Sequence, residues 1–176
     1  RNNRPDYMNN IKETQSISLY DDIMHQMNEL NANKDELKVA KQILGNLNEN
    51  GFLPIEPILI ADRLGYKESF VLDVKNKIQI LDPPGIGSLT IQECIVSQLK
   101  KYYKEDMLSL NIIEKYFDDF SKHKYEKIAE KLNCSKKDVY KTVEIVSVLN
   151  PSPAINFSTS HADHIIPDII IENLNG

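Results

Sequence analysis

The sequence predicts an all-α protein built from two small helical bundles, each ending in a helix-turn-helix-like pair, with a short extended or β segment at the C-terminus. Three observations favour this fold. Apolar residues recur at helical spacing over most of the 176 residues. A pattern of roughly seventy residues occurs twice. A Pro-Pro-Gly corner at residues 83–85 lies between the two copies, where a helix cannot continue.

The first bundle is expected over residues 16–82, after a polar stretch at residues 1–15 that is interpreted as a linker. Four amphipathic segments with helix-start and helix-stop residues lie in this range. In the third and fourth, a small residue and a glycine are spaced as in a helix-turn-helix. The predicted helices run from Ser18 to Leu30, from Asn33 to a stop at Gly51, from Pro54 or Pro57 to Leu64, closed by Gly65, and from Lys67 to Leu81.

Residues 83–88 are predicted to form a rigid joint. The two prolines fix their own φ angles and donate no N–H. Pro84-Gly85 suits the central pair of a type II turn, in which the glycine takes a positive φ. A new helix can begin at once, because Ser88 or Thr90 can cap it and a glutamate follows Thr90 at capping-box spacing.

The second bundle, expected over residues 89–150, repeats the ending of the first without a gap, since the stretch that begins IAEKLN aligns with the stretch that begins IADRLG. Asn133 takes the place of Gly65, and asparagine is the next most tolerant residue of the left-handed conformation. The alternative to an internal repeat is chance similarity between amphipathic helices. Matched positions include Ala129 with Ala61, Gln98 with Gln26, and Asn150 with Asp82.

Residues 151–176 are interpreted as an extended linker or as the start of a truncated hairpin. The run from His164 to Glu172 is rich in β-branched residues, and Asn175-Gly176 is a turn signal of hairpins. A hairpin needs a second strand after that turn, which indicates a fragment of a longer protein.

Composition and charge predict a globular protein that binds another protein, or that touches nucleic acid through one local patch. Hydrophobic residues are 41% and charged residues 27% of the chain, and a net charge of −5 argues against a large basic footprint for DNA. Apolar runs are too short to span a bilayer, and no signal-peptide pattern opens the chain. Two cysteines, Cys94 and Cys134, are expected to be buried or half-buried thiols in a reducing cytoplasm.

The sequence contains no recognisable motif for catalysis, cofactor binding or metal binding, such as a phosphate-binding glycine loop, CxxC or HExxH. His161 and His164 form an HxxH, which is interpreted as part of a surface loop rather than a metal site. We therefore predict no enzyme and assign no catalytic, cofactor or metal residue.

One lysine-rich patch surrounds the second helix-turn-helix, around residues 122–141. Between Ser121 and Lys141 the sequence has seven lysines and three acidic residues. Lys136, Lys137 and Lys141 would lie at the start of the recognition-type helix and are candidates for contacts to DNA phosphates. The alternative is a solvated helical face. The second bundle contains no arginine, so bidentate guanine readout is not available there.

The joint carries a family resemblance. LDPPGIGSLTIQECIVSQL is similar to the signature of the enhancer-dependent sigma-54 (RpoN) family of bacterial RNA polymerase sigma factors, in its core-binding domain. SLYDDIMHQM, LNENGFL, LNPSPAINFS and HIIPDIII agree in the same order. Ser88-Leu89-Thr90 stand where the family usually has Ala-Arg-Asp, and Ala154 and His164 replace a glycine and an aromatic residue. The signature residues are Asp82, Pro83, Pro84, Gly85, Gly87, Gln92 and Glu93.

The resemblance implies a non-enzymatic transcription initiation factor, cytoplasmic and associated with RNA polymerase on the nucleoid. Its partner would be core RNA polymerase, while promoter DNA and an ATP-dependent activator would act through regions absent here. No membrane partner is expected. The alternative is a helix-turn-helix DNA-binding regulator that uses the lysine-rich patch. Exposed aromatic and imidazole side chains of the first bundle are candidates for the polymerase contact, namely Tyr20, His25, Phe52 and Tyr66.

Overall fold

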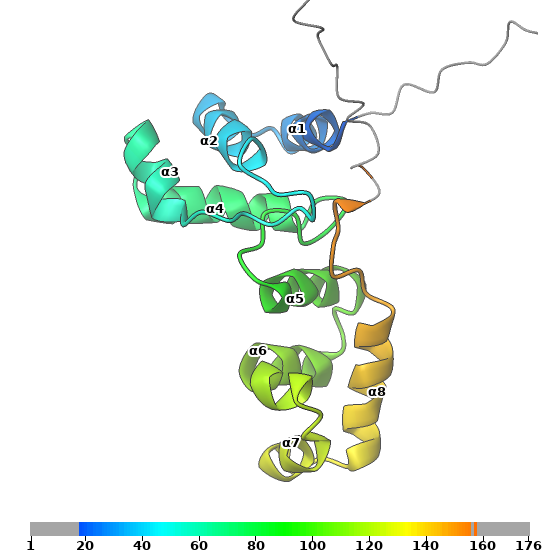
Figure 1. Ribbon diagram of the computed structural model, residues 1–176. Coiled ribbons are helices and arrows are strands. Elements are labelled where there is room, and N and C mark those ends of the chain that lie inside the picture. Colours follow the sequence, from blue (N-terminus) through cyan, green and yellow to red (C-terminus); the bar gives the residue numbers. More distant parts are fainter. Residues whose placement is uncertain (1–17, 156, 158–176) are drawn as a thin grey trace, which may run out of the picture.

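The fold is all-α, as the sequence predicts. The computed structural model describes residues 18–155 and residue 157, and within them there are eight helices and one isolated bridge, between Phe52 and Ser88. Figure 1 shows α1 to α4 in one group and α5 to α8 in another. The helices are α1 (Leu19–Glu29), α2 (Lys34–Leu44), α3 (Pro57–Leu64), α4 (Glu68–Gln79), α5 (Ile91–Tyr102), α6 (Met107–Ser121), α7 (Tyr125–Leu132) and α8 (Lys136–Ser147).

The predicted helix starts at Ser18, Asn33 and Thr90 are confirmed. Each of these side chains accepts a hydrogen bond from the backbone N–H three residues later, which satisfies a donor that the helix leaves open. Ser135 caps α8 in the same way and forms a full capping box with Asp138. Short-range side-chain chemistry therefore sets where these helices begin.

The two predicted helix-turn positions also match. Gly65 closes α3 at a φ of 73°, and Asn133 closes α7 at a φ of 48°, both in the left-handed conformation. The N–H groups of Gly65 and Asn133 return to carbonyls of their own helices. The chain thus turns at once into α4 and α8, which pack on α3 and α7 respectively.

The buried apolar residues form two clusters. The first contains Ile23, Ile43 and Val74 and draws on α1 to α4 together with the joint. The second contains Leu99, Ile112 and Val139 and draws on α5 to α8. No helix of the described residues combines the length and apolarity needed to cross a bilayer.

Three expected boundaries of the first helices are wrong. The helix α2 ends at Leu44, where Gly45 is its C-cap, and not at the predicted stop, Gly51. Gly51 lies in the following loop, where its carbonyl accepts a hydrogen bond from the N–H of Gly87 in the joint. The helix α1 ends at Glu29, one residue before the predicted Leu30, which is its C-cap and is 57% exposed. The helix α4 ends at Gln79, two residues before the predicted Leu81.

The described part of the C-terminal segment is turned rather than extended. The N–H of Ile155 donates to the carbonyl of Ser152 at 3.1 Å, and the N–H of Phe157 donates to Ala154 at 2.9 Å. The predicted hairpin strand, the HxxH histidines and the polar linker at residues 1–15 lie outside the described residues.

Candidate functional site

Three chain segments meet at the joint between the helical groups. They are the loop at residues 48–53, the Pro-Pro-Gly segment at residues 82–90, and the segment after α8. The N–H of Gly87 donates to the carbonyl of Gly51 at 2.8 Å, and the N–H of Leu53 donates to Ser88 at 3.0 Å. The first two segments therefore pair through their backbones, although they are far apart in the sequence.

Gly85 is required by the geometry of the joint. Its φ is 95°, the positive value that the predicted turn needs. A Cβ at this position would lie 2.5 Å from Cys94 Sγ, on the first turns of α5. Cys94 is buried, and its pKa is raised to about 11, mainly by that burial. Close approach of the corner to α5 is therefore possible only without a side chain at residue 85.

A buried ion pair links α4 to α5 beside the joint. Lys75 is 2% exposed, and its ammonium group contacts Glu93 Oε1. The other carboxylate oxygen of Glu93 accepts from the N–H of Leu89 at 2.6 Å, one residue before the N-cap that a full capping box would use. Burial raises the pKa of Glu93, but hydrogen bonds from Lys75, the Leu89 N–H and Gln79 outweigh it and hold the pKa below its usual value.

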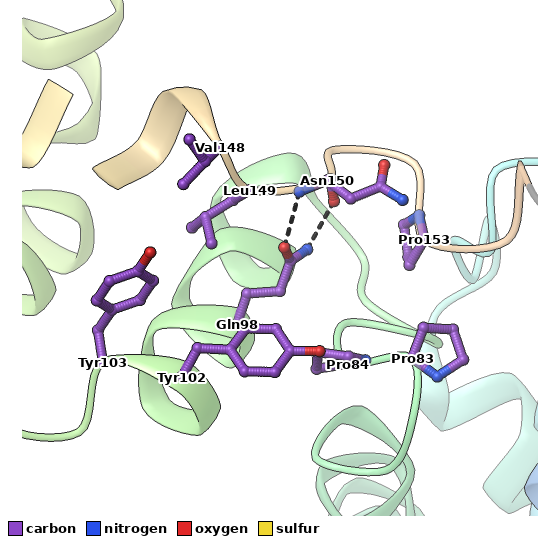
Figure 2. Close-up of a pocket in the computed structure, with 9 residues that line it drawn as sticks. All are labelled: Pro83, Pro84, Gln98, Tyr102, Tyr103, Val148, Leu149, Asn150 and Pro153. Atoms are coloured by element: carbon purple, nitrogen blue, oxygen red, sulfur yellow. Dashed lines mark hydrogen bonds between the residues drawn. The ribbon is translucent and has the colours of Figure 1, made fainter. Parts of the chain in front are cut away.

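The same glutamine clamp occurs at each proline corner. Gln26 of α1 donates to the carbonyl of Asp82 at 2.7 Å and accepts from the N–H of Asp82 at 2.8 Å. Gln98 of α5 makes the corresponding bonds to Asn150, at 2.6 and 2.9 Å (Figure 2). These are the positions that the repeat pairs with one another. One side-chain amide thus holds the backbone that leaves the last helix of each group.

A pocket of about 250 Å³ opens between the two proline corners (Figure 2). Its mouth carries Tyr102 and Val148, which are 55% and 71% exposed. Burial raises the pKa of Tyr102, and the nearby carboxylate of Asp82 adds to that. The lining combines proline, leucine and valine side chains with tyrosines and two amides, a mixture that suits contact with another protein. The lining residues are Pro83, Pro84, Gln98, Tyr102, Tyr103, Val148, Leu149, Asn150 and Pro153.

Among the described residues, no group of three or more His, Cys, Asp or Glu side chains could hold a metal ion. The carboxylate of Glu93, beside the joint, forms an ion pair with Lys75. Its neighbour Cys94 has a pKa too high for a thiolate near neutral pH.

The structure does not gather the four predicted contact residues into one site. Tyr20 and His25 lie exposed on α1, where His25 is 3.5 Å from Glu29. Phe52 lies at the joint and forms the bridge to Ser88. Tyr66, in the turn between α3 and α4, is half-buried.

Tyr66 is fixed by contacts within the first group of helices. Its hydroxyl donates to Asp35 Oδ1 at 2.6 Å. This hydrogen bond, with a smaller contribution from burial, raises the pKa of Tyr66. Its ring packs on Phe70 with centroids 5.2 Å apart. Tyr66 therefore holds the first group of helices together at a point away from the joint.

The signature residues act largely through structure. Asp82 is held by the glutamine clamp, and Gly87 pairs with the loop at residues 48–53. Gly85 packs closely on α5, and Glu93 forms its ion pair with Lys75 of α4. Gln92 donates to the carbonyls of Ile113 and Glu114 at 2.8 and 3.0 Å and so joins α5 to α6.

Much of the predicted lysine patch is paired with carboxylates. Lys136 lies 3.2 Å from Glu126, and Lys141 lies 3.6 Å from Asp138. Asp119 lies 3.0 Å from each of two further lysines, Lys127 and Lys131, whose hydrogen bonds lower its pKa to about 2. Lys137 is exposed at the start of α8.

Sequence reasoning missed Lys75 and the pocket. Lys75 follows Val74 on the apolar stripe that includes Val71 and Ile78, so its spacing was the available signal of burial. The pocket had no comparable signal. Tyr102 and Val148 come from the ends of different helices, and only the fold brings them together.

The comparisons with known proteins agree on one family. The family model described as the sigma-54 factor, core binding domain, matches residues 7–176. A curated RNA polymerase sigma-54 factor from Acidithiobacillus ferridurans is 27% identical over 171 residues, which are 95% of this chain and 36% of that protein.

Two further relatives have the same name and similar coverage. The RNA polymerase sigma-54 factor of Bacillus subtilis (strain 168) is 27% identical over 160 residues, 90% of this chain and 37% of that protein. That of Pseudomonas aeruginosa (strain UCBPP-PA14) is 26% identical over 165 residues, 90% of this chain and 33% of that protein. The chain therefore spans about a third of the length of these curated relatives.

Proposed function

The chain belongs to the sigma-54 factor family, and from this membership we propose that it is the segment that binds core RNA polymerase. The observation that carries the proposal is the match of residues 7–176 to that family's core-binding domain. The proposed role is non-enzymatic, as a part of a transcription initiation factor that acts in the cytoplasm with RNA polymerase. Promoter DNA and an ATP-dependent activator are proposed to act mainly through parts of the protein outside this chain.

Two docking units are proposed, at residues 16–82 and 89–150, joined by residues 83–88. The two buried clusters support this division. The duplicated glutamine clamp supports it independently, because Gln26 and Gln98 hold the corner residue of their own unit in the same way. In this view α3 with α4, and α7 with α8, form the helix-turn-helix-like pair of each unit.

The polymerase contact is proposed to include the pocket at the joint. Protein interfaces draw most of their energy from a few anchors, with tyrosine enriched among them. Tyr102 and Val148 expose large apolar side chains at the mouth of the pocket. Phe52 lies on the neighbouring loop of the joint. The other three predicted residues, Tyr20, His25 and Tyr66, are proposed as secondary contacts on the first unit.

Binding to purified core polymerase tests the proposal. We expect the chain to bind with a micromolar or lower dissociation constant and Val148→Asp to weaken it by at least about tenfold, the effect of losing one interface anchor of about 1.4 kcal/mol. Met107→Asp is the matched control, since Met107 is 66% exposed on α6 and does not line the pocket. Equal binding by both variants would move the contact elsewhere on the surface. No binding by the parent chain would end the proposal.

A second candidate function is contact with DNA phosphates through Lys136, Lys137 and Lys141. The basic end of α7 and α8 favours it, although Lys136 and Lys141 are already paired with acidic residues. Each phosphate contact makes binding weaker as salt rises. A duplex titration at several salt concentrations separates this function from polymerase docking. A slope near zero would exclude it, and the triple lysine-to-alanine variant should flatten any slope that is found.

A further inference from the structure

The chain that leaves α8 does not continue away from the second cluster. It crosses back to the first one. Ala154, which follows the last helix of the second cluster, is buried within the first cluster and is only 4% exposed. Its N–H donates to the carbonyl of Asn50 at 3.3 Å. A Cβ on Gly51 would lie 2.9 Å from the Ala154 Cβ, so the loop at residues 48–53 leaves room for this side chain.

The other end of this segment is held by the second cluster. Gln98 makes two hydrogen bonds to the backbone of Asn150, and Cys94 Sγ lies 3.8 Å from the same carbonyl. Ala154 is only four positions after Asn150, a reach of about 14 Å when fully extended. Residues 150–154, here called the strap, are thus fixed at both ends on different clusters.

We propose that the strap anchors the outgoing chain on the first cluster, so that the part of the protein after residue 155 starts from a fixed point of the docking body. Without the strap, that part would start from the free C-terminal end of α8. In a protein as long as the curated relatives, which are about three times the length of this chain, the strap would set where the segment that follows it begins. If the proposed function holds, docking on polymerase also sets the direction of the outgoing chain.

The strap is tested by distances within the 176-residue chain alone. Spin labels are placed at two exposed residues, by Lys67→Cys beside α4 and Ile155→Cys after the strap, and measured by double electron–electron resonance. Cys134 is first replaced by serine. Cys94 is buried with a pKa of about 11, so it does not take up the label. We expect one narrow distance distribution, and a broad one overturns the proposal.

Two variants loosen the strap, one at each end. Ala154→Asp places a charge in the first cluster and should free residue 155 from it. A freed segment of about five residues has an r.m.s. extension of about 12 Å, so the distribution of this variant should broaden by about 10 Å. Gln98→Ala removes the clamp on Asn150 and should leave the distribution narrow, because Ala154 still holds residue 155 on the first cluster. Val148→Asp is the matched control for charge at an exposed site before the strap and should leave the distribution narrow.

Helical content by circular dichroism shows which of the variants remain folded. A folded Ala154→Asp variant that keeps the narrow parent distribution overturns the proposal, because the outgoing chain is then held by something other than the strap. For the parent chain, absence of polymerase binding together with a narrow distance distribution would count only against the proposed function. A broad distribution of the parent chain with intact polymerase binding would count only against the strap.

Discussion

The buried pair between Lys75 and Glu93 should couple α4 to α5 energetically. Removing one member of a buried ion pair costs about 3–5 kcal/mol, because the other charge is left without a partner. Lys75 is 2% exposed whereas the side chain of Glu93 is 29% exposed, so the two single changes should differ. Glu93→Gln strands the buried ammonium and should cost about 3 kcal/mol. Lys75→Met leaves a carboxylate that keeps its bond from the Leu89 N–H, and should cost about 1.5 kcal/mol.

The double variant measures the coupling itself. With Lys75→Met and Glu93→Gln together, no charge remains to be compensated, so the loss should be about 2.5 kcal/mol instead of the sum of the single losses. Urea unfolding reads these values, since about 1 kcal/mol moves the midpoint by about 0.5 M at a slope of about 2 kcal/mol/M.

An exposed pair between α5 and α6 provides the control. Lys100 and Glu114 are 2.8 Å apart, with side chains that are 52% and 38% exposed. Glu114→Gln should therefore cost less than about 0.5 kcal/mol. The reasoning fails if Glu93→Gln is as mild as Glu114→Gln, or if the losses at residues 75 and 93 simply add.

Three further changes probe the joint and the second cluster. Gly85→Ala and Gly65→Ala both place alanine at a positive φ, but of the two only residue 85 has neighbours within contact distance. Gly85→Ala should therefore lower the free energy of unfolding in urea by about 1–3 kcal/mol more than Gly65→Ala. Equal losses of stability would mean that the corner does not pack tightly on α5. Gln98→Leu should lower the free energy of unfolding by about 1 kcal/mol more than Gln26→Leu, because Gln98 is buried and its loss leaves both backbone groups of Asn150 unpaired. A larger loss of stability for Gln26→Leu would contradict the clamp geometry. Asp119 has a native pKa of about 2, below its usual unfolded value, so its contribution to stability is complete above about pH 4 and is lost as the pH falls towards 2. Asp119→Asn should flatten the acid side of the stability profile, and an unchanged profile would show that the lysine pairs contribute nothing.

Local chemistry made much of the fold predictable. Ser18, Asn33 and Thr90 begin helices because a short polar side chain can bond a backbone N–H three residues on, and this depends on no distant residue. Gly65 and Asn133 end helices for an equally local reason, their tolerance of a positive φ.

The errors come from long-range packing. Gly51 resembles a helix stop in the sequence, but its positive φ serves a loop that pairs with the joint. The clamp between Gln26 and Asp82 spans most of the first unit, and the repeat pattern paired these positions with Gln98 and Asn150 without indicating that they touch. The candidate site is of this long-range kind, which is why only its signature residues and Phe52 could be named in advance.

The most direct test of the central claim is equilibrium binding of this chain to purified core RNA polymerase. We predict saturable one-to-one binding with a dissociation constant of about 1 μM or less, as expected for an interface of standard size. Cross-links from the joint, at Tyr102 or Phe52, should then map to a single region of the enzyme. Absence of binding at tens of micromolar, about ten times the predicted constant or more, would contradict the account.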